Sequence, residues 1–165
     1  MKWLRKRALF ILPLLMGVGL LLTACGGIST SALVFSHTNL ANTGFGTLTL
    51  GVSGMPDGGL ASIEVKNGGL TFDPSLFKVT GIKGLHGFTV LASVIDNSAG
   101  KVSFAAVNPA GGTTTGSVIE FSLAQKGLGS STVKIDGSKL VLGDANNQPI
   151  SVSSVSVGSE TISIP

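Results

Sequence analysis

From residue 31 onward, the sequence alternates between apolar and polar positions in many short segments. Leu48, Leu50 and Val52 alternate with threonine and glycine, so an extended chain here has one apolar face and one polar face. The same period of two recurs at residues 61–65, 102–106, 119–123 and 162–164. Turn-forming residues separate such segments about every 8–12 residues, the spacing typical of a sandwich or barrel. We therefore expect an all-β protein, an antiparallel β-sandwich of about nine strands.

Residues 70–82 contain the clearest single unit of this pattern. Leu70 and Phe72 have the phase of a half-buried strand, and Asp73-Pro74-Ser75 follows them directly. Aspartate bonds to its own backbone and proline fixes φ, so this tripeptide predicts a tight turn. Phe77 and Val79 then resume the alternation. The unit predicts two buried strand ends that meet across a corner.

Three further segments give specific expectations. Residues 88–95 are almost continuously apolar, which predicts a central strand covered on both faces. Asn67-Gly68-Gly69 has the composition of a hairpin turn. The apolar phase slips by one position at Ser153-Ser154, which predicts a bulge or a break in a strand.

The net charge of +3 comes from the N-terminus. Lys2, Arg5, Lys6 and Arg7 are four of the eleven basic residues, and without them seven lysines face eight acidic residues, a net charge of −1. No basic surface remains that could hold phosphates, so the sequence argues against nucleic-acid binding.

The first 25 residues have the organisation of an export signal. A basic segment precedes the apolar residues 8–22, and Leu22-Thr23-Ala24-Cys25 follows. This ending resembles the lipobox of bacterial lipoprotein signal peptides. The resemblance implies that residues 1–24 are removed, that Cys25 carries lipid, and that residues 25–30 form a flexible leash to a bacterial membrane outside the cytoplasm. The alternative is a signal anchor in which the cysteine is incidental.

Candidate catalytic and metal-binding residues are scattered. His37 and His86 are the only histidines and lack further ligands at a suitable spacing, so we expect two solvated loop histidines and no metal. Glu64 and Glu120 have outward strand phases rather than facing each other as a glycosidase pair does. Residues 144–148 resemble a calcium loop in composition but lack its glycine and its distal glutamate, which favours a turn. We expect no enzymatic activity and no cofactor.

The order of these segments resembles the cohesin domains and the related carbohydrate-binding modules. The similarity rests on the Phe72-Asp73-Pro74 corner, the early strand at residues 47–53 and the mid-domain strand at residues 100–104. It also includes the later segments, at residues 116–123, 143–150 and 155–164. It covers residues 31–165 and implies a jelly-roll sandwich. One departure is that no Trp or Tyr follows Cys25, although flat sugar faces are commonly held by exposed aromatic rings.

The resemblance implies a non-catalytic module that presents a sheet face to a dockerin-type protein partner, in polysaccharide degradation or in surface assembly. Two alternatives stay open: direct binding of a polysaccharide, and a structural or adhesive role in the cell envelope. The longest polar loop, residues 108–116, is a candidate partner-binding loop. Its candidate residues are Asn108, Thr113, Thr114 and Thr115.

Overall fold

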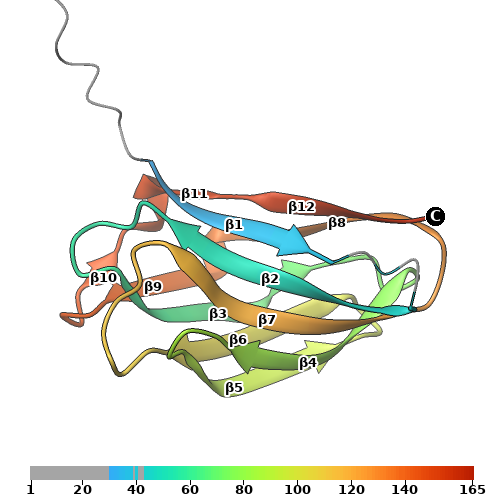
Figure 1. Ribbon diagram of the computed structural model, residues 1–165, viewed down its shortest axis with the longest axis horizontal. Helices are drawn as coiled ribbons and strands as arrows, with labels where there is room; N and C mark the ends of the chain where they lie inside the picture. The colour runs from blue at the N-terminus through green and yellow to red at the C-terminus, as the bar shows by residue number, and fades with distance from the viewer. Residues whose placement is uncertain (1–29, 39, 41–42) are drawn as a thin grey trace, which may run out of the picture.

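The computed structural model describes residues 30–165, except 39, 41 and 42, as two β-sheets packed face to face (Figure 1). The described part contains twelve strands, and its helical segments are two short 3₁₀ turns. This confirms the expected all-β sandwich. Strand β1 begins at Ser31, the first residue of the expected domain. The expected signal segment, residues 1–24, and Cys25 lie outside the described residues, and their processing stays a prediction.

The first sheet has five strands, and its central strand is β2. Its order is β11 (Val155–Val157), β1 (Ser31–His37), β2 (Phe45–Ser53), β7 (Gly116–Gln125) and β4 (Phe77–Gly84). All of its pairs are antiparallel except that of β1 with β11. The edge strands of this sheet are therefore β11 and β4.

The second sheet has seven strands and is organised around β3, its longest strand. Its main path is β10 (Pro149–Ile150), β9 (Leu140–Asp144), β3 (Leu60–Thr71), β6 (Lys101–Val107) and β5 (Thr89–Asp96). Strand β8 (Gly129–Ile135) pairs with the end of β3 and with β12 (Ser159–Ile164). Two 3₁₀ turns, η1 (Gly137–Lys139) and η2 (Val152–Ser154), precede β9 and β11.

The core lies between the two sheets. Its residues are the inward positions of the strands, as the alternation predicted, and Phe104 and Phe121 join the sheets across it. Their rings lie 5.6 Å apart in an edge-to-face arrangement, a geometry that stabilises aromatic pairs. The break predicted at Ser153-Ser154 is also confirmed, because η2 interrupts the chain there.

The corner predicted at residues 70–82 is present. The rings of Phe72 and Phe77 stack with centroids 5.0 Å apart, and both are buried. Between them, the Asp73 carboxylate accepts hydrogen bonds from the Ser75 hydroxyl at 2.6 Å and from the Ser75 backbone N–H at 2.9 Å. These bonds stabilise the ionised form and lower the pKa of Asp73 below its ordinary value. The corner thus combines a local polar turn with an apolar anchor.

The prediction of a hairpin turn at Asn67-Gly68-Gly69 is wrong, because these residues lie within one strand. Both Asn67 (φ 49°) and Gly68 (φ 63°) have positive φ, yet they lie inside β3 and form a bulge. The Ser103 hydroxyl on the neighbouring β6 accepts a hydrogen bond from the Gly68 N–H at 2.6 Å. Because this side chain satisfies the backbone group that the bulge exposes, the strand continues instead of reversing.

Candidate functional site

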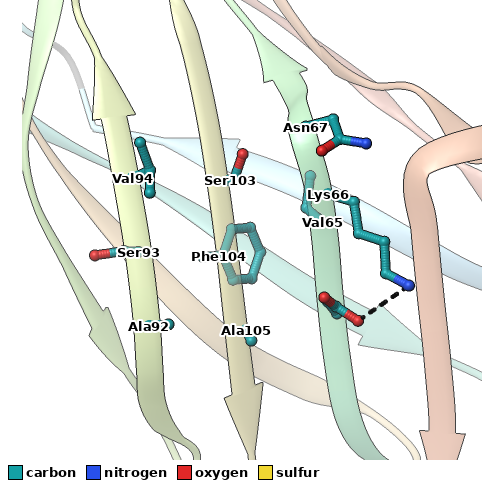
Figure 2. Close-up of a pocket in the computed structure, with 10 residues that line it drawn as sticks. Val65, Lys66, Asn67, Ala92, Ser93, Val94, Ser103, Phe104 and Ala105 are labelled. Carbon is teal, nitrogen blue, oxygen red and sulfur yellow. Dashed lines mark ion pairs between the residues drawn. The ribbon is translucent and has the colours of Figure 1, made fainter.

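A shallow groove runs along the second sheet, over β3, β6 and β5 (Figure 2). Its volume is about 420 Å³. The residues that line it come from three adjacent strands: Glu64, Val65, Lys66 and Asn67 from β3, Ser103, Phe104 and Ala105 from β6, and Ala92, Ser93 and Val94 from β5. We call this surface the β3–β6–β5 groove.

Small side chains in register produce the groove. Ala92 of β5 lies opposite Ala105 of β6, and Val94 lies opposite Ser103. On the other side of β6, Ala105 lies opposite Glu64 of β3. Side chains that lie opposite each other share a face of the sheet. In the row Glu64, Ala105 and Ala92, the two alanines project little from the sheet, whereas the longer Glu64 side chain forms a raised side on β3. The Ser103 hydroxyl is engaged by the bulge of β3, which keeps it against the sheet.

The two sides of the groove differ in chemistry. On β3, the Lys66 ammonium lies 3.5 Å from a Glu64 carboxylate oxygen, and both side chains are about half exposed. On β5, Leu91 and Val94 are 65% and 67% exposed. One side therefore carries both signs of charge, and the other is apolar. Protein-binding surfaces commonly combine apolar and polar side chains in this way.

The prediction of a central strand at residues 88–95 is wrong. Strand β5 pairs with β6 alone among the described strands, so it is an edge strand. A bulge at Leu91, where Val90 and Ala92 lie opposite consecutive residues of β6, turns that side chain out of the regular alternation. The apolar run is therefore explained by an exposed apolar surface and not by burial on two faces. Sequence reasoning missed the groove for this reason.

The turn after β5 is held by polar side chains. The Asp96 carboxylate accepts hydrogen bonds from the Ser98 hydroxyl at 2.6 Å and from the backbone N–H groups of Ser98 and Ala99. These bonds, led by that of the Ser98 hydroxyl, lower the pKa of Asp96. The Asn97 side chain accepts from the Val79 N–H at 2.8 Å and donates to the Val79 carbonyl at 2.9 Å. Asn97 thus ties the β5–β6 turn to the edge strand β4 of the other sheet.

The predicted partner-binding loop lies at the end of β6, away from the middle of the groove. Asn108 is only 9% exposed, and its side chain accepts from the Ala110 N–H and donates to the His86 carbonyl. The backbone of Thr113 pairs with Leu60 in both directions. Thr114 and Thr115 are exposed. A partner-binding role for these four residues stays a prediction, and the structure does not bring them together with the groove.

Other residues singled out by the sequence have structural partners. His37 is half-buried in β1 rather than solvated in a loop, and its Nδ1 lies 2.6 Å from Glu160 Oε1 on β12. His86 is an exposed loop residue, as expected, with Nδ1 2.8 Å from the Ser117 carbonyl. Residues 144–148 form the expected turn, because the Asp144 carboxylate accepts from the backbone N–H groups of Asn146 and Gln148. Within the described ranges, no group of three metal-ligating side chains occurs.

Most phenylalanines among the described residues are buried. Phe72, Phe104 and Phe121 are buried, as predicted. Phe45, at the start of β2, is 68% exposed. A single exposed ring does not form the row of aromatic rings that a flat polysaccharide surface requires.

Helices that could cross a membrane do not occur in the part of the chain that the structure describes.

Comparison with known proteins identifies solved structures that have a similar fold. No family model matches the sequence, and no curated protein matches it. Among solved structures, the cohesin module of a family 33 glycoside hydrolase from Clostridium perfringens has a TM-score of 0.66 at 12% identity, covering 82% of this chain and 97% of that one. A cohesin–dockerin complex from Clostridium thermocellum gives a TM-score of 0.65 at 12% identity, covering 82% and 99%.

A type II cohesin domain from the cellulosome of Acetivibrio cellulolyticus gives a TM-score of 0.61 at 15% identity, covering 81% of this chain and 94% of that one. All three similarities span nearly the whole described sandwich. The protein therefore has a cohesin-like β-sandwich fold, as the order of its sequence segments predicted.

Proposed function

We propose that this protein is a non-catalytic, lipid-anchored binding module of a bacterial cell envelope, and that its β3–β6–β5 groove binds a dockerin-type protein. The observation that carries the proposal is the exposure of Val94, which lines the groove beside a floor of small residues. Structures with the same fold include cohesin–dockerin complexes, which supports a protein as the partner. The lipid anchor rests on the sequence that ends at Cys25.

The groove suits a protein surface better than a sugar polymer. Aromatic rings are absent from its exposed lining, since Phe104 is buried in the core. Aliphatic side chains beside small residues can pack against a helix or strand of a partner. The Glu64–Lys66 pair can form polar contacts at the rim of the groove. We therefore assign Val94 as the main apolar contact of the groove.

Binding should be measured with the protein as it is extracted from membranes in detergent, after immobilisation. The probes are purified dockerin modules, including the dockerin of the Clostridium thermocellum complex. We expect at least one to bind, and Val94→Asp to weaken that binding at least about tenfold, since a buried apolar contact is replaced by a charge. The matched control is Val34→Asp on the first sheet, where Val34 is 44% exposed and far from the groove.

Equal binding by the two variants would show that the groove is not the site. No binding to any dockerin module, together with depletion of the protein on cellulose, chitin or xylan, would overturn the proposal in favour of a carbohydrate-binding module. The anchor has a separate test: mass spectrometry of the membrane-purified protein should find an acylated N-terminal Cys25 and no residues 1–24.

A further inference from the structure

The bulge of β3 holds the only Asn-Gly pair in the sequence, Asn67-Gly68. In such a pair the glycine nitrogen can attack the side-chain amide of the asparagine, because glycine has no Cβ to hinder the approach. Asn67 is exposed and has a φ of 49°, in the left-handed region that few non-glycine residues adopt. In Figure 2 its side-chain amide points out of the strand, away from Ser103. Asn67 is therefore accessible to water at an irregular point of the strand.

We propose that Asn67 is a site of spontaneous deamidation, and that Ser103 controls its rate. The Gly68 nitrogen forms a bond to Cγ of Asn67, and the bond from Cγ to the side-chain nitrogen breaks. That nitrogen leaves as ammonia, with the proton that the Gly68 nitrogen loses, and a succinimide ring remains. Water then opens the ring at one of its two carbonyl groups and leaves aspartate or isoaspartate at position 67. Water is the only co-reactant.

A hydrogen bond slows this reaction in the folded protein. The Ser103 hydroxyl accepts from the Gly68 N–H at 2.6 Å. The glycine nitrogen becomes a nucleophile only when it loses this proton, and hydroxide from the solvent does not reach the proton while Ser103 holds it. Val65 and Leu70, which flank the bulge, pair with β6 and limit the rotation that ring closure needs. Asn67 therefore reacts when the bulge opens locally.

Two lysines give the opened bulge an environment that favours the reaction. A Cβ at Gly68 would lie 2.9 Å from Cβ of Lys101. A Cβ at Gly69 would lie 2.9 Å from Cβ of Lys139, whose ammonium group donates to the Asn67 carbonyl at 3.4 Å. Both lysine side chains thus begin against the bulge. Positive charge here stabilises the negative oxygen that forms when the amide carbon is attacked, and then the carboxylate of the product.

Deamidation would change the charge of the β3–β6–β5 groove. Asn67 lines the groove beside Glu64 and Lys66, whose charges balance each other. A carboxylate at position 67 would make this side of the groove negative. Isoaspartate would also lengthen the backbone, which a bulge accommodates better than a regular strand does. The effect on binding rests on the proposed function, whereas the reaction itself does not.

Peptide mapping by mass spectrometry measures the reaction. The protein, extracted from membranes in detergent, is incubated at mildly alkaline pH, and the fraction of Asn67 converted to aspartate and isoaspartate is followed with time. We expect conversion at Asn67 and not at Asn97 or Asn147, which precede serine and glutamine. Ser103→Ala should raise the rate at Asn67 about fivefold, the factor expected for the loss of one hydrogen bond.

Three comparisons separate the hydrogen bond from a general loosening of the sheet. Ser103→Thr keeps a hydroxyl and should convert within about twofold of the parent rate. Ser93→Ala removes an exposed serine from the β5 side of the groove and should leave the rate unchanged. In concentrated urea, Ser103→Ala and the parent protein should convert equally fast, because the unfolded chains share the same Asn67-Gly68 sequence.

A folded parent protein that converts as fast as its urea-unfolded form would overturn the proposal, because Ser103 would then give no protection. Equal rates at Asn67 in Ser103→Ala and Ser93→Ala would overturn it too. A protein that binds no dockerin module but deamidates faster in Ser103→Ala would contradict the proposed function and support this inference. A protein that binds a dockerin module through Val94 and shows equal rates would do the reverse.

Discussion

Strands β5 and β7 have similar apolar content and opposite surroundings. Strand β7 lies between β2 and β4, and Phe121, Ile119 and Val118 are fully buried. Strand β5 has the same number of large apolar residues in a shorter segment, yet it lies at an edge and exposes Leu91 and Val94. Apolar content alone therefore does not say where a strand lies in its sheet. In β7 the apolar residues stabilise the fold, whereas in β5 they make a surface.

The largest effect on stability is expected when one apolar side chain in each strand is truncated. Phe121→Ala should lower the free energy of unfolding by about 3–5 kcal/mol, since it leaves a cavity between the two sheets. Leu91→Ala should change it by no more than about 0.5 kcal/mol, because Leu91 is mostly exposed. Chemical denaturation of both variants measures the difference. Equal losses would show that Leu91 is buried in solution, and β5 would then not be a free edge.

The next test asks what holds β5 in place if its side chains do not. Gly100 ends the β5–β6 turn with φ +63°, and a Cβ at this position would lie 2.1 Å from the Phe72 carbonyl oxygen. Gly100→Ala should therefore cost about 2–4 kcal/mol through steric overlap and backbone strain. Gly44→Ala is the control, because Gly44 has a similar φ of +70° and no neighbouring atom of the described residues lies within 4 Å of its Cβ position. Gly44→Ala should cost only about 1 kcal/mol.

If Gly100→Ala and Gly44→Ala lower the free energy of unfolding equally, the close packing of Gly100 against the Phe72 carbonyl does not constrain the turn. The hydrogen bonds between β5 and β6 would then be the main interaction that holds β5 in place.

A smaller effect is expected from the tie between the two sheets. Asn97→Ala removes both hydrogen bonds to the Val79 backbone and should cost about 1–3 kcal/mol. Asn146→Ala in the turn before β10 is the control, since Asn146 uses its backbone groups there. Hydrogen exchange of the Val79 amide gives a direct readout, and protection should fall in Asn97→Ala alone. Unchanged protection would contradict the assigned tie.

The smallest expected effect is on the pH dependence of stability. Hydrogen bonds lower the pKa of Asp96 below its ordinary value of 3.8, so the folded protein binds this proton more weakly than the unfolded chain. The contribution of Asp96 is therefore fully present well above pH 3.8 and is lost as the pH falls through the lowered pKa. Asp96→Asn should flatten the decrease of the melting temperature in that acidic range. A curve parallel to that of the parent protein would contradict the assignment.

Much of the fold could be predicted because it is encoded locally. The corner at Phe72 and Phe77 follows from alternation around Asp73-Pro74-Ser75, and the turn at residues 144–148 follows from side chains that bond to their own backbone. These features depend on neighbours within a few residues. All of the interacting groups are therefore close together in the sequence.

The candidate site could not be predicted because it depends on pairing between distant strands. The bulge of β3 at Asn67 is stabilised by Ser103, 35 residues from Gly68, and without that hydroxyl the same residues favour a hairpin. The edge position of β5 is likewise set by which strands pair elsewhere. The outward phase of small residues at Ser103 and Ala105 was the one signal that could have indicated a groove.

The two ends of the described sandwich have a mechanical consequence. Strand β1 begins at one end of its long axis, and β12 ends at the other (Figure 1). Strand β1 pairs antiparallel with β2 over six residue pairs, and β12 pairs with β8 over six. A force applied through these two ends would pull along the strands and load the hydrogen bonds of both ladders in shear, all at once, rather than opening them one at a time. The sandwich should therefore resist tension along its long axis better than tension across it.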